Sequence, residues 1–322
     1  MRRSVNVRVV QHRPTLGDLE ANLADHRARI EAAAEDGVDV VHFTELSLTG
    51  YALGDLVDAV ALDSDHSLWP EVCALSESVD VVLGFVERGA DGFFYNAAGY
   101  FHAGRPIHVH RKTYLPTYGP FDEGRFFTPG RSLGAFDTPW GRAALVVCEE
   151  CWHPSVAHAA AMQGAEVLFA TANAPGRGPV AGGWASHRAW REILTVYARL
   201  YAVWIPFASR VGYEEGFVFG GGSAILAPDG SLAAEADFLE PAELTGTLDA
   251  SALRRARVAN PAHGIERHEL LIAALERARV VTGDVSERGA PVASSHGPGA
   301  AVDTAAAVDP GAAVESGEVD AP

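Results

Sequence analysis

The stretch AALVVCEECWHP, residues 143–154, joins a run of apolar residues directly to a cluster of polar and reactive ones. Five apolar residues ending at Val147 are typical of a buried strand. The formation of such a strand does not require the cysteine and two glutamates that follow it. A helical pattern begins at Pro154. We therefore expect Cys148 to lie at a strand-to-helix turn, where a side chain is presented for chemistry.

Short apolar runs alternate with helical patterns along most of the chain. We predict strands at 5–11, 38–43, 79–87, 93–102, 106–110, 142–148, 166–171, 203–209, 221–228 and 243–249. We predict helices at 15–37, 154–164, 183–201 and 259–280. Near-continuous apolar strands separated by helices indicate sheets that helices cover, which is the α/β fold class.

The composition changes near residue 282. Residues 282–322 contain no aromatic residue, no Leu and no Ile, but many Ala, Gly, Pro and acidic residues. Such a segment cannot bury enough apolar surface to offset its ordering entropy. We predict a folded domain over 1–281 and a disordered acidic tail over 282–322, which serves as a solubilising linker or as a docking element for a partner.

The overall composition limits the compartment and the partners. The chain has 322 residues, of which 48% are hydrophobic, and a formal net charge of -17. This charge argues against binding to nucleic acid or to an anionic membrane surface, because both would repel it. Three cysteines cannot form a disulfide framework, and the N-terminus lacks an apolar signal segment. We therefore expect a soluble cytoplasmic protein.

Cys148 suits several kinds of chemistry. A helix N-terminus beside it can lower a thiol pKa and offer backbone N–H groups to an oxyanion, as a nucleophile requires. The spacing Cys148-x-x-Cys151 is also that of a redox pair, whereas structural zinc would need a second Cys or His pair at ligand spacing. The pair His108 and His110 suggests a metal-dependent amidohydrolase or simply two side chains on one strand face.

A thiol nucleophile needs a base and an electrostatic partner, and two other strand ends offer them. Glu45 follows the apolar run that ends near residue 43, and Lys112 follows the strand predicted at 106–110. Sites in α/β proteins form where strand C-terminal ends meet. We expect Glu45, Lys112 and Cys148 to converge at that edge.

Three segments, TELSLTGYALGDL (44–56), HRKTYLPTYGPFDEGRFFTPG (110–130) and VVCEECWHP (146–154), resemble the signature segments of the nitrilase, or carbon–nitrogen hydrolase, superfamily. The residues in these segments most resemble those of the glutaminase domain of glutamine-dependent NAD synthetase. The similarity runs in order from about residue 5 to about residue 250. The resemblance implies a four-layer αββα sandwich of the nitrilase type.

The resemblance also implies roles for individual residues. Glu45 would be the general base, Cys148 the nucleophile that forms a thioester, and Lys112 the cation that stabilises the oxyanion. Glu123 matches a second glutamate that would orient Lys112 or the substrate. The candidate substrate-binding residues are Tyr51, Tyr118, Glu149, Trp152 and Asn173. Members of the superfamily need no metal or organic cofactor and usually form homodimers or higher homo-oligomers.

The chain departs from the glutaminase pattern in the substrate loop. Pro175 stands where the pattern has a serine, Arg177 is unmatched, and Leu200 and Tyr201 replace the Glu-Asn pair of many amidases. The ATP-binding phosphate loop of the synthetase domain is not found. We predict an amidase that hydrolyses a small amide to a carboxylate and ammonia; the alternatives are a glutaminase subunit that supplies a separate synthetase, a nitrilase, and a catalytically silent binding or scaffold protein.

Overall fold

Two large β-sheets form the framework of the protein. The computed structural model describes residues 1–180 and 183–282. The first sheet has six strands in the order β16 (Ala242–Leu248), β1 (Val5–Gln11), β2 (Val40–His42), β3 (Asp80–Arg88), β4 (Phe94–His102) and β5 (Arg105–Arg111). The second has six strands in the order β15 (Leu232–Glu235), β14 (Ala224–Leu226), β11 (Ile205–Ser209), β8 (Val167–Ala172), β7 (Gly141–Val147) and β6 (Phe136–Thr138).

Each sheet has a parallel centre and antiparallel edges. Strands β1, β2 and β3 run parallel, and so do β7, β8 and β11. Strand β5 pairs antiparallel with β4, which pairs antiparallel with β3, so β5 runs in the same direction as β3. Four polar residues lie just beyond the C-terminal ends of strands in these sheets. Glu45 follows β2, Lys112 follows β5, Cys148 follows β7 and Asn173 follows β8.

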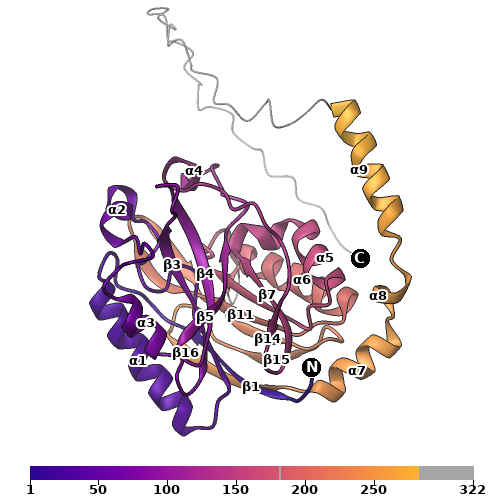
Figure 1. Ribbon diagram of the computed structural model, residues 1–322, viewed down its shortest axis with the longest axis horizontal. Helices are drawn as coiled ribbons and strands as arrows, with labels where there is room; N and C mark the ends of the chain where they lie inside the picture. The colour runs from indigo at the N-terminus through magenta and orange to yellow at the C-terminus, as the bar shows by residue number, and fades with distance from the viewer. Residues whose placement is uncertain (181–182, 283–322) are drawn as a thin grey trace, which may run out of the picture. The chain divides into compact units, whose positions relative to one another are not determined.

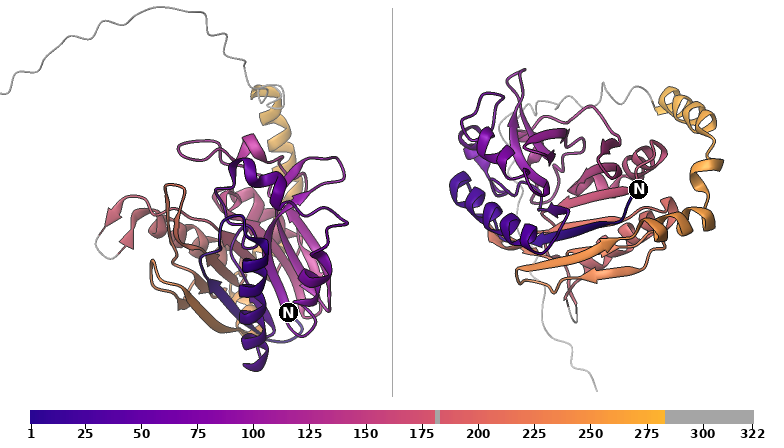
Figure 2. Two further views of the ribbon diagram at one scale, coloured as in Figure 1. Left: turned by 90° about the vertical axis from the view of Figure 1, so that its left-hand side faces the viewer. Right: turned by 60° about the horizontal axis from the view of Figure 1, so that its bottom comes forward.

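Helices cover the outer face of each sheet (Figures 1 and 2). Helices α1 (Leu19–Glu35) and α3 (Trp69–Ala74) pack their apolar residues against β2, β3 and β4. Helices α5 (Pro154–Met162) and α6 (Ala185–Tyr201) pack against the second sheet. The predicted α/β class and four-layer αββα sandwich are confirmed.

The inner faces of the two sheets share one core. Val7 and Val9 of the first sheet belong to the same buried cluster as Val146 and Phe169 of the second. The rings of Tyr100 and Phe169 meet across the sheets with centroids 5.9 Å apart. Each such side chain contributes about 1.5–3 kcal/mol by full burial, so this layer holds the sheets in a fixed relative position. Because the strands are held by this core, the strand ends that precede the polar residues are held in place as well.

Most predicted strands lie within two residues of their observed bounds, but the C-terminal prediction was wrong. Instead of one helix at 259–280, the chain forms α7 (Ala250–Ala259), α8 (Ala262–Ile265) and α9 (His268–Thr282). The break follows from Asn260-Pro261, because a proline cannot donate a helical hydrogen bond and restricts the residue before it.

The structure also contains a hairpin and several short elements that the sequence pattern did not predict. Strands β12 (Val211–Glu214) and β13 (Phe217–Gly220) pair antiparallel around a turn in which Glu215 and Gly216 both have positive φ. Glu is uncommon in that conformation, so the residues of this turn do not match a usual hairpin pattern. The remaining short elements are η1 (Gly54–Leu56), α2 (Val57–Val60), α4 (Glu123–Phe126), η2 (Cys148–Trp152), β9 (Pro179–Val180) and β10 (Gly183–Trp184).

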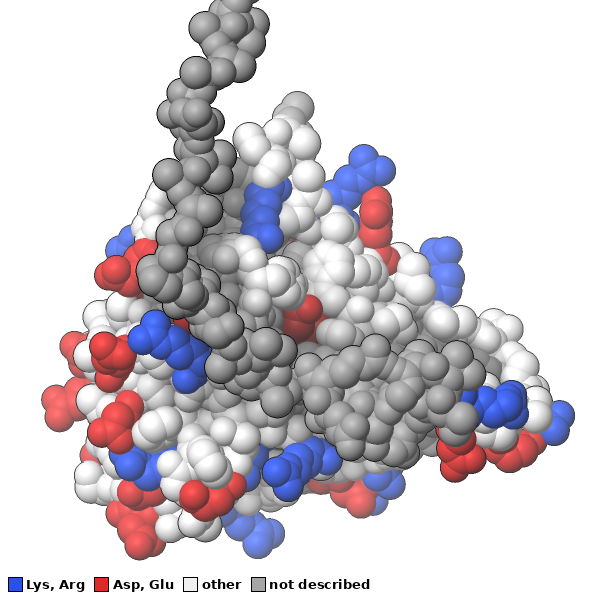
Figure 3. All heavy atoms as spheres, turned by 90° about the horizontal axis from the view of Figure 1, so that it is seen from above, with Lys and Arg blue, Asp and Glu red and all other residues white. Residues whose placement is uncertain are grey.

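The chain divides into a unit over Met1–Glu266 and a second unit from Arg267, of which α9 is the described part. The predicted domain end at residue 281 stays a prediction, and residues 283–322 of the predicted tail lie outside the described residues. Within the described ranges no helix is long and apolar enough to cross a membrane. On the uncovered part of the face in Figure 3, basic side chains are scattered among acidic and uncharged ones.

Candidate active site

Cys148 occupies a strained position at the end of β7. The strand ends at Val147, and Cys148 begins the short 3-10 helix η2 with φ of 49°. A non-glycine residue in this left-handed region costs free energy, and such strain is concentrated at functional sites. The thiol is nearly buried, with 7% of the residue exposed. The expected strand-to-helix turn is present, with η2 between the strand and α5.

A buried lysine lies between two buried glutamates beside this turn. The Lys112 Nζ atom is 2.7 Å from Glu45 Oε1 and 2.8 Å from Glu123 Oε1. All three residues are at most 5% exposed. Burying three charged groups costs desolvation free energy. The ammonium group offsets part of this cost, because it forms a charge-assisted hydrogen bond with each of the two carboxylates. Glu45 and Lys112 therefore meet as the strand-end argument predicted.

Further contacts fix the orientation of Glu45. The Asn96 side-chain amide donates to Glu45 Oε1 at 2.8 Å, and the Asn173 backbone N–H donates to Glu45 Oε2 at 2.8 Å. The Asn173 side-chain amide also donates to the Glu45 backbone oxygen at 2.9 Å. Each oxygen of the carboxylate thus has a fixed donor, which holds it in one position.

Strand β3 approaches the Glu45 loop so closely that it needs a glycine there. A Cβ atom on Gly84 would lie 2.2 Å from the Leu46 backbone nitrogen and 2.9 Å from the Glu45 carbonyl carbon. Any side chain at this position would push the loop away.

The charges of this cluster follow from burial and mutual attraction. Burial by itself lowers the pKa of the Lys112 ammonium group, but the Glu123 and Glu45 carboxylates outweigh it and raise that pKa well above its usual value. Burial raises the pKa of the Glu123 carboxyl group to about 7; Lys112 opposes this shift and Glu45 adds to it. Lys112 therefore stays protonated while a carboxyl group beside it can exchange a proton near neutral pH.

The expectation that the helix N-terminus lowers the pKa of Cys148 was wrong. Burial raises the pKa of the Cys148 thiol well above its usual value, and the nearby Glu45 carboxylate adds to this shift against the opposing charge of Lys112. The short 3-10 turn does not overcome this desolvation. The resting group is a neutral thiol, which needs a base to become a nucleophile.

Glu150 joins the loop that carries Lys112 to the loop that carries Cys148. Its buried carboxylate accepts hydrogen bonds from the Thr113 backbone N–H and hydroxyl at 2.7 and 2.6 Å, and from the Val147 N–H at 2.7 Å. His110 Nε2 lies 2.9 Å from both of its oxygens. Burial raises the pKa of Glu150, but His110 and these donors outweigh burial and lower it overall. Glu150 is thus a positioning residue.

A cavity of about 230 Å³, the thiol pocket, opens beside Cys148. It is lined by Pro116, Tyr118, Phe121, Cys148, Glu149, Trp152, Pro175, Arg177, Ser186 and Trp190. The candidate residues Tyr118, Glu149 and Trp152 therefore line the same cavity as Cys148, and the Tyr118 hydroxyl donates to Glu149 at 2.8 Å. Arg177 also lines the pocket, whereas Arg188 pairs with Glu192 on the surface.

The other two candidate substrate-binding residues lie behind the charged cluster. The Tyr51 hydroxyl donates to Glu123 Oε1 at 2.6 Å, and Asn173 holds Glu45 as described above. Neither residue lines the thiol pocket. The Tyr51 backbone N–H donates to the buried Glu214 carboxylate at 2.8 Å, which fixes its loop. Both residues orient glutamates in this structure.

The two histidines of the H-x-H pattern have different partners. His110 contacts Glu150, whereas the His108 ring stacks on Phe136 with centroids 4.3 Å apart. Over the described ranges, no three His, Cys, Asp or Glu side chains are grouped so that they could hold a metal ion.

Sequence reasoning missed Asn96 and Glu150. The signal for Asn96 was a polar residue in the apolar strand FYNAAGYFH, since buried polar residues need partners. The signal for Glu150 was a second glutamate in a turn that the flanking apolar residues bury. Neither partner could be identified, because Glu45 is 51 positions from Asn96 and Thr113 is 37 positions from Glu150.

The sequence and the fold are those of a known family of hydrolases. The family model described as carbon-nitrogen hydrolase matches residues 6–258. The chain belongs to the carbon–nitrogen hydrolase family, as its sequence motifs indicated.

Relatives within the family differ in activity and length. Glutamine-dependent NAD(+) synthetase of Thermotoga maritima is 30% identical over 260 residues, which are 80% of this chain and 44% of that protein. The chain thus spans less than half the length of this relative. N-carbamoylputrescine amidase of Solanum lycopersicum is 27% identical over 74% of this chain and 85% of its own. A carbon–nitrogen hydrolase of Helicobacter pylori has a TM-score of 0.75 at 22% identity, covering 84% of this chain and 98% of its own.

Proposed function

We propose that the protein hydrolyses the C–N bond of a small linear amide to a carboxylate and ammonia, with Cys148 as nucleophile. The observation that carries this proposal is the Lys112 ammonium group, held at 2.7 and 2.8 Å between two buried glutamates beside a buried thiol at a strained turn. Three buried charges and a strained cysteine all cost free energy, and packing alone does not explain them. In acyl transfer the cysteine would be the nucleophile, a glutamate the base and the lysine the oxyanion donor.

Glu45 acts as the general base in the first step. The pKa of Cys148 is raised by burial, so the thiol must lose its proton as the sulfur attacks the amide carbon. Glu45 takes that proton, since its carboxylate is held by Lys112, Asn96 and Asn173 and cannot turn away. The S–C bond forms, and the carbonyl electrons move onto the oxygen.

Lys112 and the backbone N–H of Glu149 stabilise the resulting oxyanion. Lys112 is protonated because its pKa is raised by Glu123 and Glu45 against the effect of burial. A preorganised donor of this kind lowers the barrier by roughly 2.7–4 kcal/mol, or 10²–10³ in rate. The neighbouring Glu123 keeps the ammonium group in place at 2.8 Å.

Collapse of the intermediate breaks the C–N bond. Glu45 returns its proton to the leaving nitrogen, ammonia departs and a Cys148 thioester remains. Glu45 then takes a proton from water as the water oxygen attacks the thioester carbon. The C–S bond breaks, Glu45 returns its proton to the sulfur, and the carboxylic acid product releases its own proton to solvent as it leaves as the carboxylate.

The thiol pocket favours a second, more specific candidate. Glu149, which accepts a hydrogen bond from Tyr118, and Arg177 bring opposite charges to one small cavity beside Cys148. A substrate with both an ammonium and a carboxylate group, such as glutamine, would find a partner for each charge. Relatives named glutamine-dependent NAD(+) synthetase agree with this candidate. The protein would then supply ammonia to a separate synthetase.

The test is ammonia release from glutamine, asparagine, other ω-amides, N-carbamoyl compounds and nitriles. Wild type, Cys148→Ala and the matched control Cys73→Ala, which removes a thiol outside the site, are run in parallel. Release that Cys148→Ala abolishes and Cys73→Ala preserves supports the proposal, and intact-protein mass spectrometry should detect the acyl group in wild type. Release confined to glutamine and weakened by Arg177→Ala identifies a glutaminase. Full activity of Cys148→Ala would exclude the mechanism.

A further inference from the structure

Two buried histidines lie against the Glu45 loop, residues 44–50. His12 follows β1 and His26 lies on α1, and they are 2% and 0% exposed. Their rings meet edge to face with centroids 5.5 Å apart, and the His26 ring stacks on Phe43 with centroids 3.9 Å apart. Burying two imidazoles costs free energy unless their nitrogens find partners. None of the proposed catalytic steps uses them.

Each imidazole contacts a hydroxyl group close to Glu45 in the chain. His12 Nε2 is 3.2 Å from the Thr44 hydroxyl, one position before Glu45. His26 Nε2 is 2.9 Å from the Ser47 hydroxyl, two positions after it. All four side chains are buried. These two contacts, the loop anchors, therefore hold the chain on both sides of the carboxylate.

The partners of the other ring nitrogens decide which atom carries the proton. His26 Nδ1 lies 2.6 Å from the Asn22 backbone oxygen, and His12 Nδ1 lies 3.1 Å from the Asp25 carboxylate. Both partners can only accept, so Nδ1 of each ring carries the hydrogen. In a neutral ring Nε2 is then an acceptor, and the loop hydroxyl group donates to it.

Burial keeps both rings neutral. It lowers the pKa of the His26 imidazole to about 3. It also lowers the pKa of His12, although the Asp25 carboxylate, which is itself paired with Arg29 at 2.9 Å, opposes this shift. A neutral imidazole keeps one bare nitrogen as an acceptor, whereas a protonated ring has none. The two loop anchors are therefore intact near neutral pH.

The backbone between the two anchors is strained. Leu46, directly after Glu45, has φ of 48°, a conformation that a leucine adopts at a cost in free energy. Such a conformation persists only where the surrounding structure fixes it. The Ser47 hydroxyl also accepts a hydrogen bond from the Gly84 N–H at 3.1 Å, so it joins the loop to β3 as well as to α1. Without its anchor the loop should relax and move Glu45.

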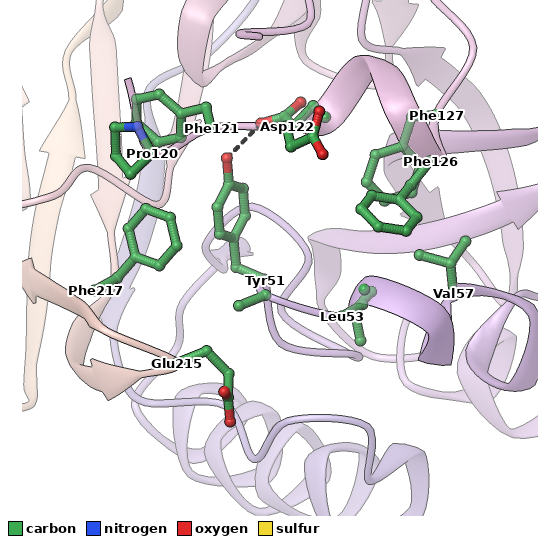
Figure 4. A pocket seen from close by; sticks show the side chains of 13 residues that line it. Tyr51, Leu53, Val57, Pro120, Phe121, Asp122, Phe126, Phe127, Glu215 and Phe217 are labelled. Carbon is green, nitrogen blue, oxygen red and sulfur yellow. Dashed lines mark hydrogen bonds between the residues drawn. The ribbon is translucent and has the colours of Figure 1, made fainter. Parts of the chain in front are cut away.

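The chain just beyond this loop carries Tyr51, four residues after Ser47. The Tyr51 hydroxyl donates to Glu123, as the dashed line in Figure 4 shows, and Glu123 pairs with Lys112. Glu45 contacts the same ammonium group at 2.7 Å. A shift of this segment would therefore disturb both carboxylates that hold the ammonium group.

We propose that His26 and His12 are positioning residues, whose neutral imidazoles hold the strained Glu45 loop so that the carboxylate keeps its place beside Lys112. This inference rests on the proposed role of Glu45 as general base. Misplacing a reacting group by about 1 Å costs on the order of 10²-fold in rate. Neither histidine lines the thiol pocket, so the effect should fall on kcat and not on KM.

Two substitutions of one histidine separate this role from ordinary packing. His26→Asn keeps an N–H group for the Asn22 oxygen but has no atom at the Nε2 position, so the Ser47 hydroxyl loses its acceptor. His26→Gln places an amide oxygen near the Nε2 position and keeps that acceptor. The matched control is His42→Asn, the same change at a buried β2 histidine whose ring lies against Phe169 and whose nitrogens have no partner among the described residues.

The first experiment follows the loop without any substrate, by hydrogen exchange of residues 44–50 measured by mass spectrometry. We expect exchange at least tenfold faster than wild type in His26→Asn, and within about twofold of wild type in His26→Gln and His42→Asn. His26→Asn and His42→Asn should lower Tm by similar amounts, since each leaves a cavity of the same size. Equal exchange in His26→Asn and wild type would overturn the anchor.

The second experiment measures kcat and KM for the best amide. We expect His26→Asn to lower kcat about 100-fold with KM within about threefold of wild type, and His26→Gln to keep kcat within about fivefold. Ser47→Ala removes the same hydrogen bond from the other side, so the double variant with His26→Asn should be no slower than the slower single variant. Equal kcat in His26→Asn and His26→Gln would overturn the positioning role.

The second anchor has its own variant. Thr44→Val removes the hydroxyl that faces His12 at nearly constant side-chain volume, and it should lower kcat about tenfold. Unchanged kcat in Thr44→Val would overturn the role of His12.

The two experiments also separate this inference from the proposed function. Faster exchange with unchanged kcat in His26→Asn would overturn the inference and leave the proposed function standing. Amide cleavage that does not depend on Cys148 would overturn the proposed function, and the exchange measurement would still decide whether the histidines hold the loop.

Discussion

The substitution Glu150→Gln tests whether the Lys112 and Cys148 loops are held together by one buried carboxylate. In wild type one oxygen accepts the Thr113 N–H and hydroxyl and the other accepts the Val147 N–H. A glutamine must turn its NH₂ group toward one of those backbone N–H groups, whichever way it is oriented. One buried donor then loses its acceptor at a cost of about 1–3 kcal/mol, and the remaining bonds lose their charge assistance.

We expect a total loss of about 3 kcal/mol in the free energy of unfolding, or roughly 6–12 °C in Tm for a unit of this size. Activity should fall about tenfold or more, because Cys148, the proposed nucleophile, and Lys112, the proposed oxyanion donor, are no longer fixed relative to each other. Urea unfolding and kcat/KM for the best amide measure the two effects.

The matched control is Glu149→Gln at the next position. Glu149 accepts a hydrogen bond from Tyr118 and lines the thiol pocket, and glutamine can still accept that bond. It should change stability by less than about 1 kcal/mol and act mainly on KM. If Glu150→Gln unfolds at the same urea concentration as wild type with unchanged kcat, the carboxylate does not hold the two loops and the reasoning is refuted.

Three further predictions follow from named contacts. Gly84→Ala should lower kcat/KM about 100-fold by moving Glu45, because its Cβ would lie 2.2 Å from the Leu46 nitrogen. The control Gly264→Ala adds a Cβ with no atom within 4 Å and should leave kcat/KM unchanged. The raised pKa of Glu123, about 7 against an ordinary 4.5, means that the folded state holds a proton that the unfolded chain releases. The stability from this proton is complete below pH 4.5 and is lost as the pH rises through 7, so wild type should lose about 3 kcal/mol over that range and Glu123→Gln should not, as urea unfolding at both pH values will measure. A chain ending at residue 282 should release ammonia at the wild-type rate, because every site residue lies within Met1–Glu266, and a large loss would give the tail a role.

The sequence by itself determined the framework and the candidate site residues. Strands β1, β3, β7 and β8 were predicted within two residues, because buried strands require apolar runs whatever surrounds them. Polar residues just beyond such runs made Glu45, Lys112 and Cys148 candidates, and the resemblance to the family's signature segments gave them their predicted roles. The rule that strand C-terminal ends meet at one edge predicted that these residues converge, and the ion pair between Glu45 and Lys112 agrees with it.

Only the tertiary structure decided how those groups are held and what lies beside them. The partners of Glu45 and Glu150 come from distant strands, and no local pattern encodes which buried donor meets which acceptor. The pKa of Cys148 is another case, since a turn pattern predicts a lowered value and the actual burial of the thiol raises it. The cavity lined by Tyr51, Glu123 and Phe217 is assembled from loops around residues 51–57, 120–127 and 215–217. Hydrophobic periodicity reports the environment of one segment at a time, whereas a cavity and a buried charge depend on several segments at once, and those are fixed only when the sheets pack.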